Sequence, residues 1–250
     1  MILRASKTIP AMVAVTCALI AVTPAGATSV AIGASKDNTL YGEPSGLLSN
    51  GAGQRLFAGI TGSSEIRRGL IEFDIASSIP AGAVIYGVTL TLNCSNAAVP
   101  TALPVTLNRV LAEWGEGTSV AAGGEGIGGV STTGDATWIH TFYNSAFWST
   151  AGGDFDAPIS ASQLIAGIGS YSWTSAAMAA DVQDWLDDDS SNHGWILRGI
   201  EDSISAKRFD SRNHANASVR PVLTIDYTIP EPATLGLLAS ALLMARRRIR

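Results

Sequence analysis

The chain has 250 residues and a formal net charge of −5, from 16 Lys and Arg against 21 Asp and Glu. Six of the basic residues lie at the two ends, so residues 28–229 carry 10 basic against 20 acidic residues, or −10. This acidity disfavours a nucleic-acid or anionic-lipid partner, because binding phosphates relies on Lys and Arg. About two hundred residues suffice for one β core, so we expect residues 28–229 to form one domain.

The N-terminus has the order of a secretory signal. Basic Arg4 and Lys7 precede an apolar run over residues 9–22, and the small residues Ala25 and Ala27 follow. This order predicts a signal peptide over residues 1–27, cut by signal peptidase after Ala27, rather than a short buried helix. The exported chain would then keep one cysteine, Cys94, and could form no intrachain disulfide.

Between the two ends the sequence reads as short strands. The best defined stretch is Arg67–Leu92, in which apolar residues alternate with polar ones on both sides of a turn at Pro80 and Gly82. This turn either closes a hairpin or carries the chain from one sheet to another with Ile79 tucked inside. Arg67 shares the inward parity of its strand, so we expect it to be paired with a carboxylate. Further strands are predicted at Ser29–Ser35, Arg55–Ile60, Pro104–Leu111, Ala136–Tyr143, Gly194–Gly199, Ala206–Asp210 and Val222–Tyr227.

One helix interrupts the strands. Met178, Val182, Trp185 and Leu186 recur at helical spacing, and Thr174 or Ser175 can cap its start. We therefore predict an all-β fold, a two-sheet antiparallel β-sandwich of the jelly-roll type, with one short helix and helical sorting segments at the two ends.

The C-terminus carries a three-part pattern. Pro230-Glu231-Pro232 is followed by thirteen mostly apolar residues and then by Arg246-Arg247-Arg248-Ile249-Arg250. As a helix the apolar run rises only about 20 Å, which makes it a marginal membrane span. The pattern resembles the PEP-CTERM sorting signal of Gram-negative bacteria. That resemblance implies transient anchoring in the inner membrane, processing by an exosortase, and delivery to the cell surface or an exopolysaccharide matrix. A permanent tail anchor is the alternative.

A second resemblance covers about residues 36–228. The runs LLSNGAGQRLFAG, RRGLIEFDIASSIPAGAVIYGVTLTL, LNRVLAEWGEGTS, GDATWIHTFY, WSTAGGDF, DVQDWL, SNHGWIL and RPVLTIDY resemble a DNRLRE-type domain of bacterial and archaeal surface proteins. The resemblance implies a β-sandwich related to carbohydrate-binding modules on secreted or surface-attached proteins. It implies no catalytic residues.

The sequence gives little sign of catalysis. Gly124, Gly126 and Gly129 match G-x-G-x-x-G, but no apolar strand precedes them and no helix follows, as a phosphate cradle requires. The three histidines, His140, His193 and His214, lack metal-ligand spacing, and no serine lies in a G-x-S-x-G motif. We predict a non-catalytic protein, with a polysaccharide-active enzyme using two carboxylates as the less favoured alternative.

Calcium is the candidate inorganic partner, because a hard cation bound by carboxylate and carbonyl oxygens can stabilise loops. Asp37, Asp154 and Asp156 are the candidate ligands, although none lies in an EF-hand. Solvated turn carboxylates are the simpler interpretation of all three.

Tryptophans suggest a carbohydrate ligand, since an exposed indole face can stack on a sugar ring. Trp185 and Trp195 fit the core, whereas Trp138, Trp148 and Trp173 lie in or next to polar, Gly-rich segments and are the candidate platforms. The expected function is therefore that of an exported surface or matrix protein associated with extracellular polysaccharide. A purely structural surface or stalk domain is the alternative.

Overall fold

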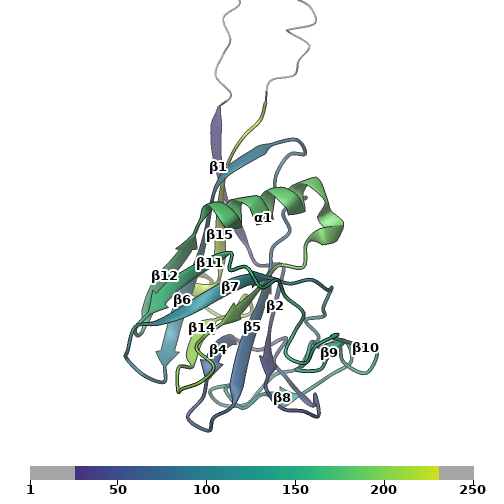
Figure 1. The fold of residues 1–250 in the computed structure, drawn as a ribbon, viewed down its shortest axis with the longest axis vertical. Coiled ribbons are helices and arrows are strands. Elements are labelled where there is room, and N and C mark those ends of the chain that lie inside the picture. The colour runs from purple at the N-terminus through teal and green to yellow at the C-terminus, as the bar shows by residue number, and fades with distance from the viewer. Residues whose placement is uncertain (1–25, 231–250) are drawn as a thin grey trace, which may run out of the picture.

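The computed structural model describes residues 26–230, and 41% of this part is strand and 9% helix. Figure 1 shows a curled antiparallel sheet with helix α1 (Ala176–Asp187) lying across it and both ends of the described chain at the top. Ala27 and Pro230 lie at the margins of this part. The remaining residues of the two predicted processing signals, Ala25, Glu231 and Pro232, lie outside the described residues.

Eleven strands form the large sheet. They are β1 (Ala27–Gly33), β2 (Lys36–Tyr41), β4 (Arg55–Ile60), β5 (Ile66–Glu72), β6 (Val84–Ala97), β7 (Leu103–Arg109), β11 (Ala161–Ile165), β12 (Gly169–Thr174), β13 (Trp195–Arg198), β14 (Lys207–Asp210) and β15 (Val222–Thr228). Two small sheets pair β3 (Leu48–Ser49) with β8 (Gly129–Val130) and β9 (His140–Phe142) with β10 (Ala146–Phe147). Two 3₁₀ turns, η1 (Asp189–Ser191) and η2 (Ala217–Val219), complete the secondary structure.

The large sheet has two halves joined by β4. In one half the long strand β6 pairs with β15, β14 and β12, and in the other β5 pairs with β2, β4 and β13. β4 belongs to both halves, because its first residues pair with β14 and its last two with β5. Nine of the eleven strands thus follow one continuous antiparallel path, and β12 and β2 pair with β6 and β5 off this path. The mostly β, antiparallel fold with one α-helix is confirmed.

The stretch from β5 to β6 is a crossing and not a hairpin. The two strands do not pair with each other; β5 lies in one half of the sheet and β6 in the other. Ile79, in the corner between them, is 2% exposed and packs in the core. Arg67 is also buried and forms an ion pair with Glu65 at 2.5 Å, which confirms the predicted carboxylate partner.

Two apolar clusters fill the fold. The main core, under helix α1, is centred on Phe73, Trp173, Trp185, Trp195 and Phe209. The second core contains Leu40, Leu70, Val110, Trp114, Ala136, Trp148 and Ile196.

Helix α1 covers the main core with the predicted apolar stripe, whose residues Met178, Val182, Trp185 and Leu186 are all buried. The Ser175 hydroxyl accepts from the Met178 N–H at 2.9 Å and so caps the helix. Within residues 26–230, no helix is both long and apolar enough to cross a membrane.

Candidate functional site: a cleft on the outer face of the sheet

Three neighbouring strands, β4, β14 and β6, carry a row of side chains on one face of the sheet. Their register places Phe57 opposite Arg208 and Arg208 opposite Asn96. Adjacent residues in a strand point to opposite faces, and Leu56 and Phe209, the neighbours of Phe57 and Arg208, are fully buried, while Asn96 is exposed. The row from Phe57 to Asn96 therefore lies on the outer face of the sheet.

The loop over residues 122–127 forms a wall beside this row. Together they enclose an open cleft of about 530 Å³, lined by Phe57, Asn96, residues 122–127 and Arg208. Phe57 is 6% exposed and forms part of the floor, whereas Ile127 is 72% exposed. The cleft thus combines apolar surface with a guanidinium group and a carboxamide.

Buried side chains hold two carbonyl groups of the loop. The Tyr41 hydroxyl donates to Glu125 O at 2.7 Å, and Arg67 Nε donates to Gly126 O at 3.0 Å. In a planar trans peptide the carbonyl and the next N–H point in opposite directions, and no cis peptide bond occurs in the described chain. The N–H groups of Gly126 and Ile127 therefore point away from the buried anchors, and both residues line the cleft.

Gly124 and Gly126 keep the cleft open. Neither has a φ in the left-handed range, so the backbone does not require glycine at these two positions. A Cβ on Gly124 would lie 3.6 Å from Arg208 Nη1, and one on Gly126 would lie 3.7 Å from Phe57 Cε1. Both are ordinary contact distances, so the fold could accept alanine. A side chain at either position would, however, occupy space against the residues that line the cleft.

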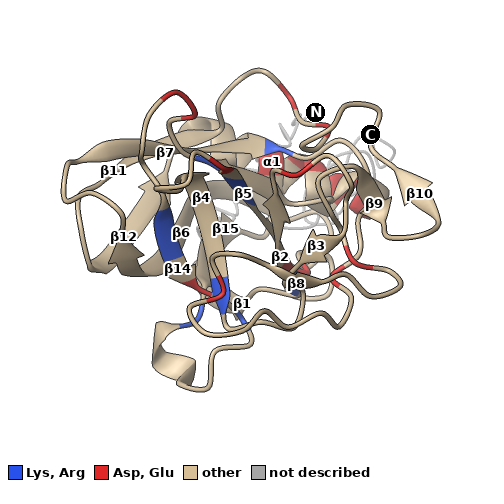
Figure 2. Ribbon diagram, turned by 90° about the horizontal axis from the view of Figure 1, so that it is seen from below, with Lys and Arg blue, Asp and Glu red and all other residues tan. Residues whose placement is uncertain are grey.

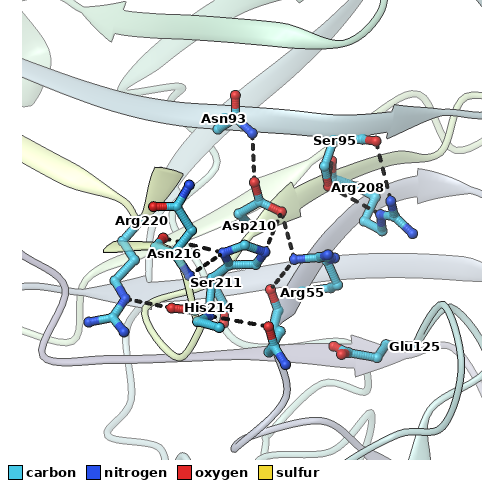
Figure 3. Close-up of polar contacts among 12 residues, drawn as sticks. Arg55, Asn93, Ser95, Glu125, Arg208, Asp210, Ser211, His214, Asn216 and Arg220 are labelled. Carbon is cyan, nitrogen blue, oxygen red and sulfur yellow. Dashed lines mark hydrogen bonds and ion pairs between the residues drawn. The ribbon is translucent and has the colours of Figure 1, made fainter. Parts of the chain in front are cut away.

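A second polar row supports the first, as Figure 3 shows. Asp210 is buried and accepts from Arg55 Nη1 at 2.8 Å and from Asn93 Nδ2 at 2.6 Å. Arg208 Nε donates to Ser95 Oγ at 3.2 Å, and its Nη2 donates to Ser95 O at 3.3 Å. Within the described residues no protein group accepts from Arg208 Nη1, which is the nitrogen nearest Gly124.

Positive charge is concentrated in the sheet. Eight of the ten basic residues between 28 and 229 lie in strands, namely Lys36, Arg55, Arg67, Arg68, Arg109, Arg198, Lys207 and Arg208. Most acidic residues lie in loops or in helix α1, as the red and blue segments of Figure 2 show. The cleft therefore offers an Arg in a domain whose connecting loops are acidic.

The prediction of an exposed sugar platform is wrong for two of the three tryptophans, Trp148 and Trp173. Trp148 is 5% exposed and Trp173 is 1% exposed, and their Nε1 groups donate to Thr137 O and Val105 O. The polar neighbours of both residues suggest the surface, but each indole packs into one of the two apolar cores. Trp138 is half-buried, and the Arg68 guanidinium lies over its ring, 4.9 Å from the centroid.

The two stretches with candidate calcium ligands, Asp37 and Asp154-Phe155-Asp156, place their carboxylates in different surroundings. Asp37 is buried, accepts from the Arg212 N–H at 2.7 Å, and has a pKa raised to about 7 by burial. Asp154 accepts from the N–H groups of Ser149 and Thr150 and closes a loop. Asp156 lines a smaller hollow of about 150 Å³ with Arg109 and Asp181. Among residues 26–230, no three His, Cys, Asp or Glu side chains are grouped so that they could hold a metal.

The three histidines lie in separate parts of the domain and make local contacts. His140 Nδ1 is 2.9 Å from the Thr137 hydroxyl, and burial lowers the pKa of this imidazole. Burial also lowers the pKa of His193, whose carbonyl accepts from Trp114 Nε1. His214 lies 3.9 Å from Asp210. The G-x-G-x-x-G glycines lead into the two-residue strand β8, so the strand and helix of a phosphate cradle are missing here.

A scan against protein-family models found no match for this chain, and a search of curated proteins found none either. The cleft therefore has to be interpreted from its own residues. The sequence signals that could have located it are the Gly-rich run 123–129 and the alternation of Lys207-Arg208-Phe209-Asp210.

Proposed function

We propose that this chain is an exported protein of the cell surface or extracellular matrix, and that its domain binds polysaccharide through the cleft without catalysing a reaction. The domain would be of the DNRLRE type, and its curled sheet a variant of the jelly roll. The observation that carries the proposal is the open cleft on the outer face of the sheet, whose glycine wall leaves room beside Phe57 and Arg208.

The lining suits a sugar. Ile127, 72% exposed, offers apolar surface for the C–H face of a ring, while Arg208, Asn96 and the N–H groups of Gly126 and Ile127 can donate to sugar oxygens. A small number of polar groups around an apolar patch is the usual composition of a ligand site. Ile127 and Asn96 are exposed, whereas Trp148 and Trp173 are buried.

The position of the cleft fits a surface protein. β1 and β15 pair from Ala27↔Thr228 onward, so both ends of the described chain leave the domain together. In Figure 1 these ends are at the top, whereas β4, β14 and β8 lie in the lower half. A domain attached through either end would hold the cleft away from its attachment point.

Retention of residues 28–229 on a glycan array tests the proposal. This fragment keeps both apolar cores and all eleven strands of the large sheet, with only Ala27 removed from β1. Gly124→Ala should narrow the cleft beside Arg208 and weaken retention, and Ile127→Asp should weaken it by removing exposed apolar surface. Ile168→Asp is the matched control, because Ile168 is similarly exposed at 77% but lies outside the cleft.

The same array separates the alternatives. Retention on no glycan would favour a structural surface domain, and turnover of a polymer that is lost on changing one carboxylate would indicate an enzyme. Running it with calcium and with a chelator tests whether a cation contributes. Retention that is lost with the chelator but unchanged by Gly124→Ala would show that the glycan binds outside the cleft.

Mass spectrometry of the exported protein tests the sorting proposal. We expect an N-terminus at Thr28 and loss of the tail near Pro230-Glu231-Pro232. An intact Arg250 at the cell surface would contradict exosortase processing and favour a permanent tail anchor.

A further inference from the structure

The large sheet has one open edge. In the described part, four of its strands have a single sheet partner: β1, β2, β11 and β12. β2 is buried along nearly its whole length, and Asn38 on it donates to the loop carbonyls of Glu116 and Ala136. β11 and β12 follow each other in the chain and lie against each other. β1 is the most exposed of the four, with five of its seven residues exposed.

β1 lacks the features that normally protect an edge. Its seven residues, Ala-Thr-Ser-Val-Ala-Ile-Gly, include no charge and no proline, and its pairing with β15 runs without a bulge. Exposed edges of this kind present unpaired N–H and C=O groups to any strand that can reach them, and proteins usually blunt them with Lys, Pro or bulges. An edge of this length is thus suited to pair with another strand.

The side chains of β1 favour a second copy of the same strand. Val30 and Ile32 are its half-buried residues and pack against the main core, while the alternate residues Ser29, Ala31 and Gly33 are small and exposed. In an antiparallel pair centred on Val30, the two Val30 side chains meet and each Ile32 faces the partner's Thr28. The second strand would cover the open flanks of Val30 and Ile32 and extend the core across the pair.

We propose that two copies of this chain associate through their β1 edges, forming a two-fold dimer with a continuous sheet and Val30 at its centre. The small residues on the other face let the strands meet without a clash, and the uncharged edge brings no like charges together. The dimer carries two clefts, which would raise the affinity for a repeating polymer by avidity.

Sedimentation of residues 28–229 at micromolar concentration tests the dimer. The unmodified domain should sediment as a dimer, and Ala31→Lys should raise the dissociation constant at least tenfold by placing like charges on the edge. Ser170→Lys is the matched control, since Ser170 is an exposed strand residue on β12. A domain that stays monomeric, or a dimer that Ala31→Lys leaves intact, would overturn the proposal.

Disulfide trapping tests the register. Val30→Cys should crosslink two chains on oxidation, because residues directly opposite in an antiparallel pair have Cβ atoms about 5 Å apart. Ile32→Cys should not, because the two substituted positions would be separated by roughly 13 Å along the strands. The native Cys94 is buried and leaves the background low. Crosslinking of Ile32→Cys, or of both variants equally, would contradict a pair centred on Val30.

Discussion

The two interiors of this domain are stabilised by different physics. Under helix α1, the main core is apolar, and Trp195, Trp185 and Phe73 pack with ring centroids 4.6–6.4 Å apart. At the loop-rich end, buried polar groups replace much of the apolar packing. Asn38 there accepts from Thr39 N and Asn50 N and donates to Glu116 O and Ala136 O.

The difference explains where a binding site can exist. An apolar core fixes strands and a helix but leaves few polar groups free, whereas loops held by side-chain hydrogen bonds can form a shaped wall. The cleft loop is held in this way, through Asn50 Nδ2 to Glu125 Oε2 at 2.8 Å and Tyr41 to Glu125 O. The main core thus gives the domain its stability, and the polar end gives the cleft its form.

The largest effect should come from the apolar side. Trp195→Ala removes a fully buried indole whose Nε1 donates to Asp181 at 2.8 Å. It should lower the free energy of unfolding by about 3–5 kcal/mol, through lost burial and a new cavity. Urea unfolding measures this loss. A loss below about 1 kcal/mol would mean that the main core is not the chief source of stability.

Asn38→Ala removes hydrogen bonds at the loop-rich, polar end of the domain. It leaves the N–H groups of Thr39 and Asn50 without their acceptor, and a buried unpaired group costs about 1–3 kcal/mol. Because two such groups lose their acceptor, we expect a loss of stability of the same order as for Trp195→Ala, with faster amide exchange in loops 42–54 and 113–137 while helix α1 stays protected. Equal loosening of α1 and of these loops would show that the two ends unfold as one unit.

Apolar stripes were predictable from the sequence, whereas strands and tryptophans with polar neighbours were not. Period-two and helical patterns predict β4, β14, β15 and the stripe of α1, because a buried apolar face requires apolar residues at a regular spacing in the sequence. The sequence analysis does not predict β2, β11 or β12. The Lys36-Asp37-Asn38-Thr39 start of β2 looks like a loop, and its burial depends on distant loops that bind it and on its pairing with β5. Trp148 and Trp173 were misplaced for a related reason, since their local neighbours are polar and their packing partners are remote. Phe57, Arg208 and Gly124 meet only through the fold.

The pH dependence of stability should also come from the polar side. The pKa of Asp37 is raised to about 7 by burial, against an ordinary value of 3.8, and Glu116 nearby raises it further. The folded state therefore holds a proton that the unfolded state releases, so stability falls as pH rises from about 4 through 7, by up to ~1.4 kcal/mol per pH unit. Asp37→Asn should flatten this slope in urea unfolding at pH 5 and pH 8. An unchanged slope would assign it to other carboxyls with raised pKa, such as Glu116 or Asp135.

The smallest effect on stability is expected at the cleft itself. Asn96 is exposed, and its Oδ1 accepts only from the neighbouring Ala97 N–H, at 2.9 Å, so Asn96→Ala should change the free energy of unfolding by no more than about 0.5 kcal/mol. Arg208→Gln should likewise leave the fold intact, since the Arg208 side chain donates hydrogen bonds only to Ser95 among the described residues. Both should nevertheless weaken glycan retention, whereas Arg220→Gln, which makes the same charge change at an exposed turn outside the cleft, should not. Loss of binding without loss of stability would separate the site from the scaffold, because residues kept for packing cannot be removed at so little cost to folding.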